Sequence, residues 1–310
     1  MVQRAGDAGP LADIREPMIP EFPNAREVTL DDKPFFDSIF AVKQPDLSAY
    51  TFTNIFAWRG ACNTSVARIN DHLLVFCDLG DYILCLEPLG QGAIRPVIEE
   101  TLRKIDRPVV FRHLSSHAIT QLEGSGFTIE SDRNNYDYVY SAEDLIKLAG
   151  RGYDGKRNQI TRAKASINYE YNRMNADIAA ECMEFAANWC ERRDCETEEG
   201  LRYELRAIYE MLTNFNALGL VGGAIRTSGA IVAFSLGETL NNETLVVHVE
   251  KADNRIDGLY QLINNEFCIA EARSYKYVNR EQDLGIPGLR RAKESYHPTQ
   301  IIATFRAFMA

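Results

Sequence analysis

The chain has no long apolar run, which excludes one class of protein at the outset. No stretch of its 310 residues approaches the ~20 apolar residues needed to cross a bilayer. Residues 1–24 lack an apolar core and a small-residue cleavage site, so we expect a poorly ordered lead-in rather than a secretory signal. With 45% hydrophobic and 25% charged residues, the chain has the composition of a soluble globular protein.

Cysteines and histidines at metal-ligand spacing are also missing. The seven cysteines are odd in number and contain no Cys-x-x-Cys, so we predict reduced thiols and a cytoplasmic location. Among the five histidines, His113 and His117 are four positions apart, but Ser115 and Ser116 between them favour a turn over one helix. We therefore predict no metal site.

Positive charge is scarce overall but gathers in one segment. The net charge is −10 and the pI is about 5.1, which argues against broad non-specific binding of nucleic acids. Residues 151–173, in contrast, carry six Lys or Arg against Asp154 and Glu170. This segment either contacts an anionic ligand or is an ordinary solvated surface.

Apolar periodicity and turn residues predict an α/β protein in which one order of elements occurs twice. Each half has a strand, two helices, three antiparallel strands, a helix, a strand, a helix and a strand. The predicted strands are 27–30, 63–70, 72–79, 81–88, 109–113, 127–130 and 136–140 in the first half, and 167–173, 220–226, 230–238, 244–250, 275–278 and 299–309 in the second. This order resembles the GNAT acyltransferase fold. It implies two tandem GNAT-like domains with mixed sheets, at 25–145 and 146–310.

Residues 275–298 hold more chemically capable side chains than any other stretch. A short strand leads into a polar segment at 279–283, and Pro287 is suited to the first turn of a helix that stops before Pro298. Open α/β sheets bind ligands at such strand ends, although a charged helix is often just solvated. The converging residues are Asn279, Arg280, Asp283, Lys293, Tyr296 and His297.

Three motifs carry a family resemblance. They are TFTNIFAWR at 51–59, KRNQI at 156–160 and VNREQDLGIPGLRRAKESYHP at 278–298. From about residue 25 onward the chain resembles the phosphatidylglycerol lysyltransferase C-terminal-like proteins, a bacterial tandem-GNAT family related to the aminoacyl transferases that modify lipids and peptidoglycan. The resemblance implies transfer of an acyl or aminoacyl group from acyl-CoA or aminoacyl-tRNA to an amine or hydroxyl. The membrane-spanning region of the lysyltransferases has no counterpart here, so we do not expect a phospholipid acceptor.

The GNAT resemblance also implies where a thioester donor would bind. Its pyrophosphate would lie at the start of the helix after the fourth strand, at residues 251–258, because a helix N-terminus favours an anion. Only Arg255 and Gly258 match the family pattern, while Asp253 and Asp257 would repel phosphate, so an ordinary helix start is the alternative. The candidate cofactor-binding residues are Asn254, Arg255, Ile256 and Gly258.

Acyl transfer requires a base, a group that polarises the carbonyl and a proton for the leaving atom. His248 and Glu250 alternate along a predicted strand, so we expect both on one face, with Glu250 as the base and His248 as its neighbour or substitute. Tyr296 lies near the helix end where many GNAT enzymes carry a tyrosine that protonates the leaving group. The alternatives are that the strand pair faces solvent and that the tyrosine merely packs.

The remaining polar candidates would hold the substrates. Lys293 and His297 are one turn apart and suit a carboxylate or phosphate, whereas Asn279 and Asp283 suit a cationic amine. The basic segment that begins at Lys156 and Arg157 would contact the phosphates of tRNA. The first half has no comparable polar group, so we expect the site in the second half. The rival hypothesis is a non-catalytic tandem-GNAT protein that binds a small molecule without converting it.

Overall fold

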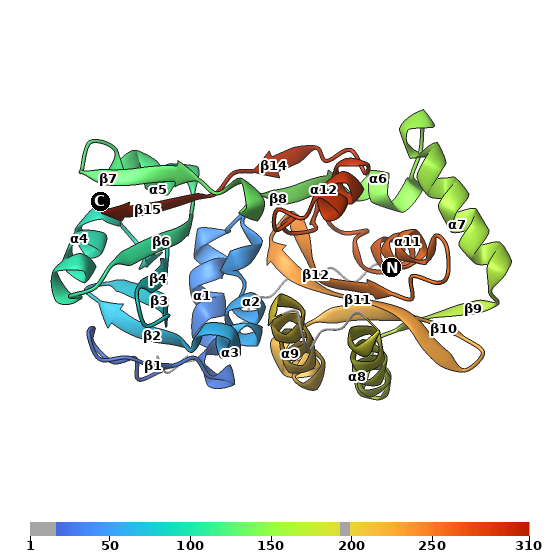
Figure 1. Ribbon diagram of the computed structural model, residues 1–310, viewed down its shortest axis with the longest axis horizontal. Coiled ribbons are helices and arrows are strands. Elements are labelled where there is room, and N and C mark those ends of the chain that lie inside the picture. The colour runs from blue at the N-terminus through green and yellow to red at the C-terminus, as the bar shows by residue number, and fades with distance from the viewer. Residues whose placement is uncertain (1–16, 193–198, 310) are drawn as a thin grey trace, which may run out of the picture.

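Two β-sheets lie side by side in the computed structural model, which describes residues 17–192 and 199–309 (Figure 1). The first sheet has the order β1-β2-β3-β4-β6-β15-β7, with β5 beside β3, and the second has the order β9-β10-β11-β12-β13-β8-β14. The strands of the first sheet are β1 (Arg26–Glu27), β2 (Thr64–Ile69), β3 (His72–Asp78), β4 (Ile83–Leu86), β5 (Leu89–Gly90), β6 (Val109–Leu114), β7 (Phe127–Ser131) and β15 (Phe305–Met309). Those of the second are β8 (Asp137–Ser141), β9 (Tyr169–Arg173), β10 (Val221–Thr227), β11 (Ala230–Asn241), β12 (Thr244–Ala252), β13 (Tyr277–Asn279) and β14 (Gln300–Ile302).

Both sheets follow one plan, and the expectation of a mixed α/β, GNAT-like fold is confirmed. In each, three antiparallel strands lead through a helix to a parallel neighbour: β4 pairs with β6, and β12 pairs with β13. The other pairings of named strands in the described residues are antiparallel.

The two halves exchange strands. β8 belongs to the first half in sequence but lies in the second sheet, between β13 and β14. In return, β15 at the end of the chain lies in the first sheet, between β6 and β7. The single strand predicted at 299–309 is therefore two strands in different sheets. Sheet membership thus differs from the predicted division at 145, because the exchanged strands come from opposite sides of it.

Helices cover both sheets and fill the space between them (Figure 1). Helices α1, α2, α8 and α9 contribute to one shared core, which includes Phe36, Phe52, Phe185 and Phe234. A second core joins α6, α7 and α11 to the other face of the second sheet, and a third joins α4 and α5 to the first sheet. The helices are α1 (Lys33–Lys43), α2 (Phe52–Ala57), α3 (Arg59–Cys62), α4 (Arg95–Lys104), α5 (Ser116–Leu122), α6 (Ala142–Lys147), α7 (Asp154–Ser166), α8 (Ala176–Glu191), α9 (Glu199–Thr213), α10 (Phe215–Leu218), α11 (Leu259–Glu271) and α12 (Pro287–Glu294), with short 3-10 turns at η1 (Leu30–Asp32), η2 (Ser48–Tyr50), η3 (Arg133–Asn135) and η4 (Arg151–Tyr153).

Local sequence explains where several helices begin. Thr51, Ser115 and Asn175 each accept a hydrogen bond from a backbone N–H of the helix that follows, and so satisfy a donor that the first turn leaves unpaired. Pro287 occupies the first position of α12, where its missing N–H costs no intrahelical bond.

Two expectations about the first half are wrong. Cys62 and Cys77 form a disulfide rather than reduced thiols, because the β2–β3 register places Cys77 opposite Thr64, two residues after Cys62. The lead-in predicted at 1–24 extends too far: Phe22 is buried in the first-sheet core, and its N–H donates to the Arg68 carbonyl. Residues 1–16 lie outside the described residues. Within the described ranges, no helix combines the length and the apolar character required to span a membrane.

Candidate functional site

The parallel strands β12 and β13 separate part-way along, and the polar residues of the second half gather there. Only Thr244–Val246 of β12 pairs with β13, through Tyr277–Asn279. Beyond that point β12 continues to Ala252, while the chain after β13 turns away. We call this place the β12–β13 splay.

His248 and Glu250 do not share a face, contrary to the alternation expected from sequence. The register shifts at this point of β12: Val249 pairs with Leu236 and Val247 with Gly237, which leaves His248 as the extra residue of a bulge. Glu250 therefore turns toward α11, where the Asn264 amide donates to it. His248 turns to the opposite face, which also carries Glu238.

Glu250 is held by two side chains that each leave one polar atom unpaired. Arg280 Nη2 donates to Glu250 Oε1 at 3.0 Å, and Asn264 Nδ2 donates to Oε2 at 2.9 Å. The ion pair is mostly buried, with 12% of the Arg280 side chain and 15% of the Glu250 side chain exposed. Arg280 Nη1 and Asn264 Oδ1 are buried without a hydrogen-bond partner among the described residues. A free donor and a free acceptor thus flank one carboxylate.

Aromatic rings and a second cation line the same side of the splay. The Arg280 guanidinium lies 4.6 Å from the centroid of the Tyr296 ring and 5.6 Å from that of Tyr140. Lys156 Nζ lies 4.1 Å from the Tyr296 centroid and donates to Ser295 Oγ. Burial raises the pKa of Tyr296 well above its usual value, so this tyrosine keeps its proton near neutral pH. Burial, followed by repulsion from Arg280, lowers the pKa of Lys156.

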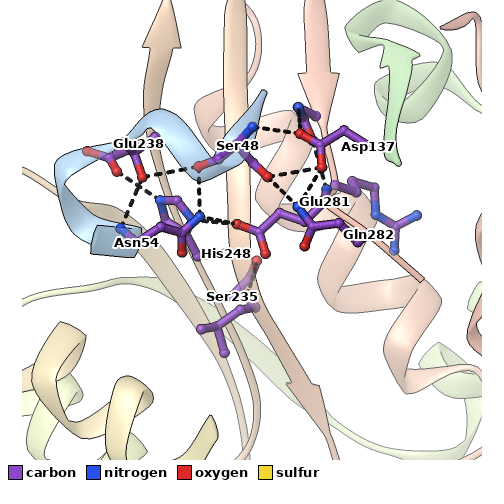
Figure 2. Close-up of polar contacts among 12 residues, drawn as sticks. Ser48, Asn54, Asp137, Ser235, Glu238, His248, Glu281 and Gln282 are labelled. Atoms are coloured by element: carbon purple, nitrogen blue, oxygen red, sulfur yellow. Dashed lines mark hydrogen bonds and ion pairs between the residues drawn. The ribbon is translucent and has the colours of Figure 1, made fainter. Parts of the chain in front are cut away.

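On the opposite face, His248 is clamped between two carboxylates (Figure 2). Its Nε2 lies 2.9 Å from Glu238 Oε1, and its Nδ1 lies 2.8 Å from Glu281 Oε1. Burial by itself lowers the histidine pKa, but the two carboxylates outweigh burial and raise the pKa to about 9. At neutral pH His248 is therefore a buried cation.

The same network joins the two halves through Asp137 (Figure 2). This buried carboxylate accepts hydrogen bonds from Ser48 of the first half and from Asn279 and Gln282 of the second. Asn54 at the start of α2 adds a donor to the Glu281 carboxylate. Burial raises the pKa of Asp137 to about 6. Through Asp137 and Glu281 the network ties Ser48 and Asn54 of the first half to Asn279 and Gln282, and so holds the loop after β13 against the first half.

Three residues predicted to hold substrate are committed to structural contacts instead. The Asn279 amide donates to Asp137 and to the Asp46 carbonyl, and its oxygen accepts from the Glu281 N–H. Asp283 is fully buried and accepts hydrogen bonds from Arg133, Arg290 and Tyr138, and its pKa lies well below the usual range although burial opposes this. Neither side chain is open to a cationic amine. Lys293 donates to the carbonyls of Arg280 and Glu281, so it does not converge with His297.

His297 and Arg157 also make contacts within the protein rather than facing an open site. The His297 ring packs edge-on against Tyr153 and lies 3.2 Å from the Gly152 carbonyl. Arg157 donates to the Leu148 and Gly150 carbonyls and pairs with Asp154. Burial, followed by repulsion from Arg280, lowers the pKa of Lys293 to about 8.

The predicted cofactor loop is covered by a helix. A Cβ added to Gly258 would lie 2.0 Å from the Gln159 carbonyl oxygen, so α7 packs directly on the turn before α11. Arg255 pairs with Asp253 at 2.9 Å, and Ile256 packs against the second core. Asn254 is exposed. The described residues contain no cluster of His, Cys, Asp or Glu arranged to hold a metal ion.

The basic charges of α7 are largely neutralised. Arg162 pairs with Asp257 at 2.7 Å, and Lys164 pairs with Glu266 at 3.1 Å. The segment is therefore less positive in the fold than in the sequence.

A family model described as phosphatidylglycerol lysyltransferase, C-terminal, matches residues 40–308. The chain belongs to this family. A solved relative, a conserved protein of unknown function from Bacteroides thetaiotaomicron, is 35% identical with a TM-score of 0.86, over 94% of this chain and 100% of the other. L-PGS from Bacillus licheniformis has the same fold at 14% identity and a TM-score of 0.64, over 94% and 93% of the two chains. An uncharacterised protein of Mycoplasmoides gallisepticum is 25% identical over 67% of this chain and 74% of its own length.

For this member of the phosphatidylglycerol lysyltransferase C-terminal family, sequence reasoning missed two site residues. Asn264 was not singled out, although an asparagine on the apolar face of a helix indicates a buried polar contact. Glu281 was covered only by the polar segment predicted at 279–283. Its backbone is left-handed, with φ +55°, and its carboxylate turns toward His248. The family resemblance itself was confirmed.

Proposed function

We propose that this chain transfers an aminoacyl group from aminoacyl-tRNA to an amine or hydroxyl acceptor at the β12–β13 splay. The observation that carries the proposal is the pair of unpaired atoms around Glu250, Arg280 Nη1 and Asn264 Oδ1. Buried polar atoms are nearly always hydrogen-bonded, so two unpaired ones beside one carboxylate indicate a place for a ligand. Family membership supports a transferase.

An aminoacyl ester matches the two unpaired atoms in kind. Its α-ammonium is a donor and suits Asn264 Oδ1, whereas its carbonyl oxygen is an acceptor and suits Arg280 Nη1. A plain acyl group offers only the second contact. The site therefore favours an aminoacyl over an acyl substrate.

The transfer step uses three side chains. The acceptor nitrogen or oxygen attacks the ester carbonyl carbon and gives its proton to Glu250, while Arg280 stabilises the negative charge that develops on the carbonyl oxygen. The tetrahedral intermediate then releases the ribose oxygen, which takes a proton from Tyr296. The proton held by Glu250 then passes to the Tyr296 phenolate, so both side chains return to their starting protonation states. The raised pKa of Tyr296 is consistent with a proton donor at neutral pH.

The covered turn before α11 favours tRNA over a coenzyme A donor. The carbonyl oxygen of Gln159 lies against Gly258, where the pyrophosphate of a thioester donor would otherwise meet backbone N–H groups. A carbonyl oxygen at that position repels phosphate. Displacement of α7 would also break the ion pair between Arg162 and Asp257.

A thermal-unfolding titration tests the donor. Aminoacyl-tRNA at about 100 times its dissociation constant should stabilise the fold by about 2.7 kcal/mol. N-acetylated aminoacyl-tRNA, which lacks the ammonium, should bind more weakly, and acetyl-CoA should cause no shift. A shift with acetyl-CoA alone would contradict the proposal. Tight binding of aminoacyl-tRNA that is recovered unchanged after incubation with acceptor amines and hydroxyls would favour the non-catalytic binding protein.

A further inference from the structure

Arg280 and Glu281 are neighbours in the chain, but their side chains lie on opposite faces of the second sheet. Arg280 Nη2 donates to Glu250 at the β12–β13 splay. The Glu281 carboxylate lies on the face that carries His248, whose Nδ1 is 2.8 Å from Glu281 Oε1. This two-residue segment therefore connects the proposed reaction site to the contact between the halves.

The first half reaches the segment through Asn54. Its Nδ2 donates to Glu281 Oε1 at 2.9 Å and to the Ser48 carbonyl at 2.8 Å. Asn54 is firmly placed, because it lies in α2, whose Phe52 and Phe56 are buried in the core that both halves share. A helix of the first half and strand β12 of the second thus hold the same carboxylate oxygen (Figure 2).

The backbone of the segment is held as closely as the carboxylate. The Glu281 N–H donates to Asn279 Oδ1 at 2.8 Å, and the buried Lys293 Nζ donates to the carbonyls of both Arg280 and Glu281. Glu281 has a left-handed backbone, with φ +55°, which disfavours residues other than glycine. Such a conformation persists where the surrounding contacts enforce it. The contacts around Glu281 therefore set the backbone at this position.

Arg280 depends on this backbone because its own side-chain contacts do not fix its guanidinium. Nη2 donates to Glu250, whereas Nη1 is buried without a hydrogen-bond partner in the part of the chain that the structure describes. A contact through two nitrogens would fix the plane of the guanidinium, and a contact through one does not. Its other neighbours are the ring faces of Tyr296 and Tyr140. The position of Nη1 therefore follows from where the Arg280 backbone is held.

We propose that Asn54 and His248 are positioning residues for transfer: they hold Glu281, and through it they place Arg280 Nη1 against the ester carbonyl. This inference rests on the proposed function, because Arg280 meets the ester only if transfer takes place at the splay. The three side chains proposed for the transfer step all belong to the second half. The inference gives the first half a task in the reaction, since α2 sets Arg280 from the opposite face of the sheet.

Single-turnover transfer from aminoacyl-tRNA measures the effect of Asn54→Ala. We expect a rate about tenfold lower at an unchanged dissociation constant, because a misplacement of about 1 Å costs about 10²-fold and Asn54 is one contact of several. Arg59→Gln is the matched control. It removes another contact between the halves, the 3.0 Å ion pair with Glu210, and should transfer at the wild-type rate. Urea unfolding checks that both variants are folded in the assay.

A double-mutant cycle separates positioning from a general loss of structure. Arg280→Lys removes Nη1 and should lower the rate by about 10²–10³-fold. Because Asn54 acts by placing that nitrogen, Asn54→Ala should cost about tenfold in the wild type and almost nothing in the Arg280→Lys background. Equal losses in the two backgrounds would overturn the proposal.

Nuclear magnetic resonance tests the same link without any activity. In protein that contains isotope-labelled arginine, the Nε–H signal of Arg280 is the one that disappears in Arg280→Lys. This signal should shift in Asn54→Ala and in His248→Gln, and should stay in place in Arg59→Gln. A signal that moves in neither of the first two variants would overturn the proposal, even where transfer is observed. A shift in a protein that shows no transfer would support the link to Arg280 and contradict the proposed activity alone.

Discussion

The charge on His248 makes the stability of the fold depend on pH in a way that one substitution should remove. Its side chain is fully buried between Glu238 and Glu281, at 2.9 and 2.8 Å. Burial disfavours the charged form, but the two carboxylates prevail and raise the pKa to about 9. Because the folded pKa lies above the unfolded value, the stabilisation is complete below about pH 6.5 and is lost as the pH rises through 9.

The magnitude follows from the difference in pKa. A rise from 6.5 to about 9 corresponds to about 3 kcal/mol of unfolding free energy. His248→Gln keeps a hydrogen-bonding side chain but carries no charge, and it leaves two mostly buried carboxylates, Glu238 and Glu281, without a cation. We therefore expect it to be less stable than the wild type by about 3 kcal/mol near pH 6, with the gap closing toward pH 10.

Urea unfolding of both proteins across this pH range measures the gap. The comparison cancels most contributions of groups that titrate in both proteins, such as Lys293, whose pKa is lowered to about 8. Parallel stability curves, with a gap that does not narrow between pH 6 and pH 10, would contradict a charged His248. They would mean that His248 is neutral in the folded state.

Three further substitutions each test one feature of the fold: a close backbone contact, a buried carboxylate and a disulfide. Gly258→Ala should destabilise the protein by about 2–4 kcal/mol in urea, because its φ is +82° and the new Cβ would collide with the Gln159 carbonyl. Asp283→Asn should lose less stability on acidification than the wild type. The lowered pKa of Asp283 adds stability above about pH 4, and this stability is lost as the pH falls below that value. Identical acid unfolding profiles of the two proteins would contradict this. Cys62→Ser should lower the unfolding free energy by about 3 kcal/mol in non-reducing buffer, as expected for the loop of 15 residues closed with Cys77, and this difference should disappear when dithiothreitol reduces the wild type.

The order of elements could be predicted from sequence because helices and strands follow local periodicity. The partners of the strands could not be predicted in the same way. β8 and β15 are only five residues each, and their residue pattern does not assign them to one sheet rather than the other. Only the path of the whole chain decides that each crosses into the other half's sheet. The predicted division at 145 could not include this exchange.

The candidate site was predictable in part for a similar reason. The sequence predicts Glu250 on one strand and Arg280 just after a later one, and the parallel pairing of β12 and β13 brings these two side chains together. Their roles in transfer stay predictions. The bulge at His248 was not predictable, because a bulge is a property of two strands and strict alternation was the only rule available from one. The contact with Asn54 spans more than two hundred residues and has no local signal.

The most direct test of the central claim is single-turnover transfer from radioactive aminoacyl-tRNA to a panel of amine and hydroxyl acceptors. Glu250→Gln removes the proposed base, and Glu243→Gln changes an exposed glutamate next to the same strand. We expect product with the wild type and Glu243→Gln, and a rate lower by about 10²–10⁴ for Glu250→Gln at unchanged binding of tRNA. Equal transfer rates for the two variants would contradict it.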